Sequence, residues 1–145
     1  MKTRHARPLP AVRRREEGRV NDQEYLKKYE SQLDLGSTKW IFGLDEHEDH
    51  AGQSLATRNH EVIQKWAEER NATPATIPGT EHEGRPGVLR FDFPGYGGRE
   101  LKHISWEDWF RSFDDRELVF LYQEHLKSGN QSNFFKMNSP HREAA

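Results

Sequence analysis

The chain has 145 residues, no cysteine and a formal net charge of −2, and only 32% of its residues are hydrophobic, with a mean hydropathy of −1.09. This length suits one domain with tails, and the lack of cysteine excludes disulfides and thiolate chemistry. No apolar run approaches the ~20 residues that span a bilayer, and no signal-peptide core follows the N-terminal arginines. We therefore expect a cytoplasmic protein with no membrane partner.

The first 20 residues are strongly basic, with seven lysines and arginines against two glutamates. Two prolines and few apolar side chains predict a disordered basic arm over residues 1–20. The arm could attract nucleic acid or another polyanion, or it could be a solubilising tail. The side chains expected to bind a polyanion are Arg13, Arg14, Arg15 and Arg19.

Residues 21–58 read as an extension with one short helix and an acidic linker. Apolar residues at helical spacing predict a helix over 21–33, and Gly36 is placed to end it. The apolar run 40–44 is a strand or a docking peptide, and residues 51–58 have the composition of a linker.

The segment Asp45–His50 is the one candidate metal site in the sequence. On a helix, His47 and His50 would share a face with an acidic neighbour. No third histidine stands at a useful spacing, and no apolar shell would orient the ligands. An acidic, solvated linker explains the segment as well, so we predict no metal and no cofactor.

Residues 59–137 carry most of the aromatic side chains and are expected to form the compact domain, followed by a tail over 138–145. Asn59 should cap a helix over 60–70, and Ser105 should cap a helix whose one face carries four aromatic rings. The four rings are Trp106, Trp109, Phe110 and Phe113. Short extended segments are expected at 74–77, 88–93, 118–126 and 132–137, the last two as an antiparallel hairpin.

The predicted fold class is therefore α+β. A small, mostly antiparallel sheet should pack against two amphipathic helices in the order helix, strand, strand, helix, strand, strand.

The compact segment resembles a small bacterial domain family of hypothetical proteins. The matching words, in family order, are HEVIQKWAEER at 60–70, PATIPGT at 74–80, GVLRFDF at 87–93, ISWEDWF at 104–110, FLYQ at 120–123 and SNFFK at 132–136. They extend over a little more than half of the chain, and the resemblance implies no particular catalytic residue. Some members are labelled 1,4-alpha-glucan branching enzyme, which implies a (β/α)₈ barrel of roughly 200 residues or more with paired acidic catalysts. This chain is too short for that barrel.

Motifs for catalysis are missing from the sequence. There is no G-x-S-x-G elbow, and the glycine-rich 95–98 segment lacks the Lys-Ser/Thr of a phosphate loop. We therefore predict no catalytic residues.

Two loops beside the 88–93 strand carry several cations that could form a patch for a phosphate or a carboxylate partner. The predicted binding surface comprises Arg85, Arg90, Tyr96, Arg99, Lys102 and His103. Alternating acidic residues leave an ordinary mixed surface as the other interpretation.

We expect a small accessory or interaction module of the bacterial cytoplasm that binds protein. The alternatives are nucleic-acid binding through residues 1–20 and a small hydrolytic or sugar-related activity.

Overall fold

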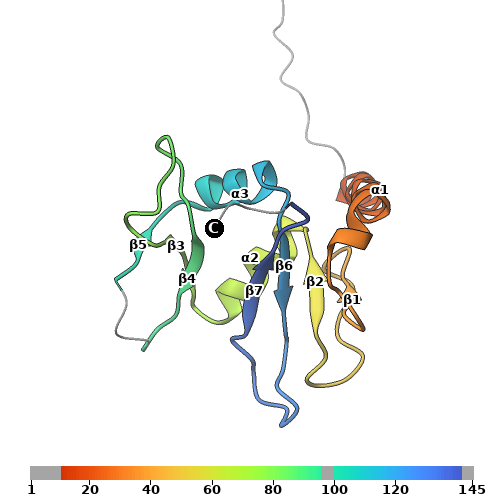
Figure 1. The fold of residues 1–145 in the computed structure, drawn as a ribbon. Helices are drawn as coiled ribbons and strands as arrows, with labels where there is room; N and C mark the ends of the chain where they lie inside the picture. The colour runs from red at the N-terminus through yellow and green to blue at the C-terminus, as the bar shows by residue number, and fades with distance from the viewer. Residues whose placement is uncertain (1–10, 96–99, 142–145) are drawn as a thin grey trace, which may run out of the picture.

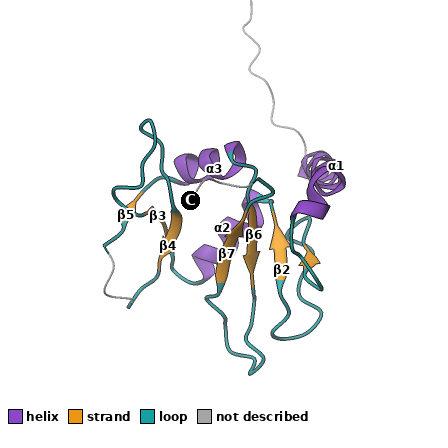
Figure 2. Ribbon diagram, viewed as in Figure 1, coloured by secondary structure: helices purple, strands orange, loops and turns teal. Residues whose placement is uncertain are grey.

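The computed structural model describes residues 11–95 and 100–141 (Figure 1). In this part of the chain, three α-helices and seven short strands are arranged as two sheets with helices around them (Figure 2). The elements are α1 (Ala11–Tyr29), the 3₁₀ turn η1 (Glu30–Gln32), β1 (Lys39–Trp40), β2 (Leu55–Thr57), α2 (His60–Glu69), β3 (Thr73–Thr76), β4 (Leu89–Asp92), β5 (Lys102–His103), α3 (Trp106–Asp115), β6 (Val119–Tyr122) and β7 (Phe135–Asn138).

The predicted α+β class is confirmed, with two sheets where one was expected. The first sheet has the order β1-β2-β6-β7 and the second the order β4-β3-β5, and only the β1–β2 pair is parallel. The predicted order of helices and strands after Asn59 holds, with the two-residue strand β5 added. The expected hairpin of the last two strands is also present as the antiparallel β6–β7 pair.

Both C-terminal helices begin where the sequence predicts. The Asn59 side chain accepts a hydrogen bond from the Val62 amide at 3.0 Å, and the Ser105 side chain accepts one from the Asp108 amide at 3.0 Å. Each helix then buries one stripe of side chains in the main core, which also contains side chains from both sheets. The aromatic face of α3 is central to this core, because Trp109 stacks on Phe91 with ring centroids 5.0 Å apart.

The first sheet is buried on two faces. Along β6, Phe120 and Tyr122 belong to the main core, whereas Val119 packs in a second cluster with Tyr25 and Tyr29 of α1. This follows from the alternation of side chains along a strand. Helix α1 therefore covers the outer face of the sheet, as Figure 1 shows at the right of the view.

Helix α1 corrects the prediction of a disordered basic arm. The helix begins at Ala11, so the prediction is wrong for residues 11–20, and residues 1–10 lie outside the described residues. The expected helix over 21–33 ends at Tyr29 and continues as η1. The helix extends beyond the predicted start because docking at its C-terminal half provides the nucleus, and each further residue then adds a hydrogen bond.

The predicted boundary at Asn59 does not coincide with an edge of the core. Residues 55–57, which read as linker, form β2 and are completely buried between β1 and β6. Ile41 and Leu55 belong to the same core cluster as Trp109. The short, weakly apolar segment 55–57 gains its strand character from pairing with β6, and segment 39–40 gains it from pairing with β2. Local composition does not show these pairings.

The docked face of α1 holds a buried carboxylate. Asp22 is only 8% exposed, and burial raises its pKa from 3.8 to about 6. Two neighbours oppose this shift of the pKa only in part. They are the positive charge of Arg58 and the indole N–H of Trp40, which lies near Asp22 without a hydrogen-bond partner. The ionised form of Asp22 therefore weakens the docking of α1 at neutral pH.

The packing of the core predicts a large loss of stability when a buried aromatic side chain of α3 is replaced by alanine. Trp109 and Phe113 are fully buried, so Trp109→Ala or Phe113→Ala should lower the free energy of unfolding by about 3–5 kcal/mol. Urea unfolding measures the change, with the exposed Glu107→Ala on the same helix as the control. An unchanged midpoint for a folded Trp109→Ala variant would contradict the packing.

Asp22 predicts a pH dependence of stability. Because its pKa is higher in the folded state, the protonated form contributes stability that is fully present below about pH 3.8 and is lost as the pH rises through about 6. Asp22→Asn should therefore be more stable than the unaltered chain at pH 7.5, and the difference should shrink as the pH falls towards 4. Urea unfolding of both proteins across this range measures the difference. A difference that does not vary with pH would contradict the burial of an ionisable carboxyl here.

Candidate functional site

Two long connections meet at one end of the first sheet. The connection 41–54 joins β1 to β2, and the connection 123–134 joins β6 to β7. Because β2 pairs with β6, the two connections emerge side by side, at the bottom of Figure 1.

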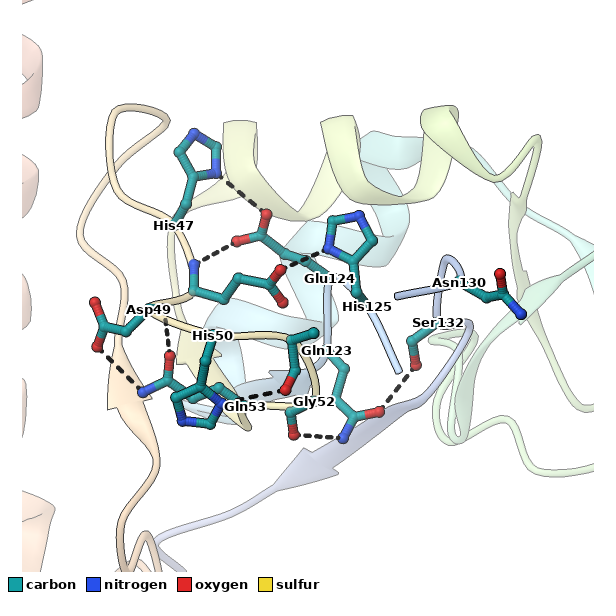
Figure 3. Close-up of polar contacts among 12 residues, drawn as sticks. His47, Asp49, His50, Gly52, Gln53, Gln123, Glu124, His125, Asn130 and Ser132 are labelled. Carbon is teal, nitrogen blue, oxygen red and sulfur yellow. Dashed lines mark hydrogen bonds and ion pairs between the residues drawn. The ribbon is translucent and has the colours of Figure 1, made fainter. Parts of the chain in front are cut away.

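Two histidine–glutamate pairs link the connections reciprocally (Figure 3). His47 Nδ1 lies 3.2 Å from Glu124 Oε2, and His125 Nδ1 lies 2.6 Å from Glu48 Oε2. The Glu48 amide also donates to Glu124 Oε1 at 2.8 Å. An ionised carboxylate can only accept, so each imidazole donates from Nδ1 and leaves Nε2 directed away from the pair. We call these four residues the His–Glu clasp.

Backbone hydrogen bonds reinforce the clasp. The Gly52 amide donates to the His125 carbonyl at 2.9 Å, and the Gln123 side-chain amide donates to the Gly52 carbonyl at 3.1 Å. Gly52 has a φ of +87°, and a Cβ there would lie 2.6 Å from Lys127 Cγ and 3.2 Å from the Lys127 backbone nitrogen. Only glycine therefore allows the two connections to approach this closely.

A pocket of about 130 Å³ lies between the connections and α2. Val62, Trp66 and Tyr122 give it an apolar base, and all three are buried. Its other lining residues are Leu44, Glu46, His47, Lys65, Glu69, Arg70, Glu124, His125 and Gln131.

Arg70 at the pocket is buried and structurally engaged. Its guanidinium lies 4.3 Å from the centre of the Trp66 ring and donates to the backbone carbonyls of Trp66, Glu124 and Ser132 at 2.9, 2.9 and 2.6 Å. Burial lowers the pKa of Arg70, although an arginine remains charged in a protein. The three carbonyls stabilise this buried charge and leave it little capacity for a ligand.

The candidate metal segment Asp45–His50 forms turns and bends, so the helical arrangement considered for His47 and His50 is wrong. His50 Nδ1 instead lies 3.1 Å from the Ala51 carbonyl, and Asp49 pairs with Lys39 Nζ at 2.9 Å. The Lys39 ammonium is the main cause of the lowered pKa of Asp49. Within residues 11–95 and 100–141, no group of three or more histidine or carboxylate side chains is placed to hold a metal ion.

The predicted binding surface is brought together only in part. Arg85 and Lys102 line one cleft beside α3 together with Arg111, which is not part of the predicted surface. Arg85 pairs with Asp115 at 3.2 Å, and Arg111 with Glu107 at 2.8 Å. Two of the three cations that line this cleft are therefore paired with carboxylates of α3.

Two further members of the predicted surface lie on β4 and β5 of the second sheet. His103 pairs with Asp92 across β3 at 2.7 Å, and the exposed Arg90 donates to the Leu89 carbonyl at 3.2 Å. Asp92 on β4 therefore pairs with His103 on β5 across the intervening strand β3. Tyr96 and Arg99 lie outside the described residues.

The four arginines proposed to bind a polyanion all fall within α1. Arg19 pairs with Glu46 at 3.8 Å, and its guanidinium lies 4.6 Å from the centre of the Phe42 ring. Arg19 therefore anchors α1 to the 41–54 connection. The binding roles of Arg13, Arg14 and Arg15 stay predictions.

Comparisons of the chain with protein-family models, with curated proteins and with solved structures return no match. The resemblance to a bacterial family of hypothetical proteins therefore stays a prediction. None of the described helices is both long enough and apolar enough to cross a membrane.

The His–Glu clasp was not predicted from the sequence. The only local signal is the mirrored order of the dipeptides His47-Glu48 and Glu124-His125, which lie more than 70 residues apart. That order becomes meaningful only once β2 is known to pair with β6.

Gly52 predicts how sensitive the clasp is to steric change. Gly52→Ala should separate the two connections, because the new Cβ would clash with Lys127. Amide hydrogen exchange in residues 45–53 should then rise by at least an order of magnitude, corresponding to about 1.4 kcal/mol of lost local stability.

Gly129→Ala is the matched control. Gly129 also has a positive φ, +93°, but a Cβ there would meet no atom within 4 Å. This variant should carry only the backbone strain common to both positions. Equal protection of residues 45–53 in the two variants would contradict the proposed close approach.

Proposed function

We propose that the protein is a protein-binding module that contacts its partner through the end formed by the connections 41–54 and 123–134. The distribution of exposed apolar side chains carries this proposal. Among the side chains that the structure describes, four large hydrophobic ones are exposed, and three of them lie on these connections: Leu44, Leu126 and Phe134, which are 39%, 44% and 49% exposed. The fourth, Val20, is on α1.

Apolar side chains gathered at one end are typical of a contact surface. Leu44 borders the pocket, and Leu126 directly follows His125, which also borders it. A partner covering these side chains would remove them from water, which provides a hydrophobic driving force for association. The proposed contact surface therefore combines exposed apolar groups with a pocket.

The His–Glu clasp supports the proposal through preorganisation. Hydrogen bonds already link the two connections at both backbone and side-chain positions. Ordering a free loop upon binding costs conformational entropy, and linked loops avoid much of that cost.

Nucleic-acid binding through residues 1–20 is the other expectation from the sequence. Arg19 is engaged with Glu46 and Phe42, so one of the four arginines proposed to bind a polyanion is already used within the fold. The protein-binding proposal is therefore the one that the arrangement of side chains favours.

Site-specific photo-crosslinking tests the proposal. A photoreactive amino acid placed at Leu126 should give discrete protein adducts in native lysate, and the same group at Val20 should not, although both positions are exposed. Leu44→Ser combined with Phe134→Ser should remove the Leu126 adducts without changing the thermal unfolding midpoint by more than a few degrees. Adducts from both positions alike, or adducts with nucleic acid only, would contradict the proposal.

A further inference from the structure

We infer that the pocket between α2 and the two connections receives a cationic side chain, arginine or lysine, from the protein partner. This inference rests on the proposed function and adds the chemistry of the group that the partner inserts.

The end of the molecule that carries the pocket is acidic. The two connections hold one lysine, Lys127, against five carboxylates. The five are Asp45, Glu46, Glu48, Asp49 and Glu124. A basic partner segment would be attracted to this end, and an acidic one would be repelled.

The lining carboxylates have unequal capacity for a new partner. Glu124 is occupied by the Glu48 amide and His47, and Glu46 accepts from the Phe42 amide at 2.6 Å. Glu69 is different, because its nearest cation is Arg70 Nη1 at 4.0 Å and its side chain is 54% exposed. Glu69 is therefore the lining carboxylate best able to accept a hydrogen bond from an incoming cation.

One of the two lining cations is already used within the fold. The Arg70 guanidinium already donates to three backbone carbonyls. Lys65 is exposed and has no ion pair within the described part of the chain, so it would repel a cationic ligand and attract an anionic one. Lys65 therefore distinguishes the two signs of ligand.

A contact beside the pocket shows the same chemistry within the chain. The Arg19 guanidinium lies against the Phe42 ring and pairs with Glu46, which also lines the pocket. A guanidinium held between an aromatic ring and a carboxylate is a stabilising arrangement. The pocket volume of about 130 Å³ suits the end of one side chain.

The test uses two blocked tripeptides, leucine–arginine–leucine and leucine–glutamate–leucine, added to the full chain and followed by two-dimensional ¹⁵N NMR. The arginine peptide should shift the indole N–H signal of Trp66, which donates to the Gln123 carbonyl beside the pocket. The glutamate peptide should bind more weakly at the same low salt concentration. Raising the salt concentration should lower the affinity for the arginine peptide and reduce the difference in affinity between the two peptides.

Three variants of α2 then test the assignment. Glu69→Gln should lower the affinity for the arginine peptide by about two- to fivefold, as expected for one partly exposed charge. Glu68→Gln removes an exposed carboxylate that does not line the pocket, and should leave the affinity unchanged. Lys65→Gln should strengthen the arginine peptide by a similar factor.

The outcomes separate the inference from the proposed function. Any of three results would overturn the inference. They are tighter binding of the glutamate peptide than of the arginine peptide, a lower affinity for the arginine peptide in Lys65→Gln, and no binding of the arginine peptide. Adducts at Leu126 in the crosslinking experiment would still support a protein-binding surface in each of these cases. If the Leu126 position gave no protein adducts while the arginine peptide still bound more tightly than the glutamate peptide, the proposed function would be overturned. The pocket would then be a site for free cations.

Discussion

The antiparallel pairing of β2 with β6 is the constraint on which the rest of the structure depends. It makes β6 a central strand, so the side chains of that strand alternate between the main core and the face covered by α1. The same pairing places the start of β2 beside the end of β6, so the connection that enters β2 (41–54) and the connection that leaves β6 (123–134) lie side by side. The core, the docking of α1 and the His–Glu clasp therefore share one structural cause.

Asp22 and Arg70, two charged residues that are buried in the described part of the chain, are accommodated in different ways. Arg70 is stabilised by three backbone carbonyls and a stacking ring, which compensate for the loss of hydration. Asp22 has no comparable set of donors, so its burial is reflected in a raised pKa. The charge of Arg70 is therefore compensated by hydrogen bonds within the fold, whereas the contact between α1 and the sheet is weakened by an ionised carboxylate at neutral pH.

The distribution of ion pairs explains why the candidate site differs from the predicted one. The predicted surface grouped cations by their proximity to a strand, but Arg85 and His103 of that group each have a carboxylate partner in the structure. Charged groups paired within the fold provide less attraction for a ligand. The connections 41–54 and 123–134 instead combine exposed apolar side chains with a pocket.

The sequence by itself determined the elements whose signals are local. The caps at Asn59 and Ser105 and the apolar stripes of α2 and α3 depend on residues within one or two helical turns, so their spacing predicts them. The alternation of Arg90 and Asp92 with Leu89 and Phe91 likewise identified β4. Only the tertiary structure decided that β1 and β2 belong to the core, that α1 extends to Ala11, and that His47 and His125 face glutamates from distant segments. The physical reason is that these features arise from contacts between segments distant in the sequence. Spacing along one segment carries no information about which other segment it will meet.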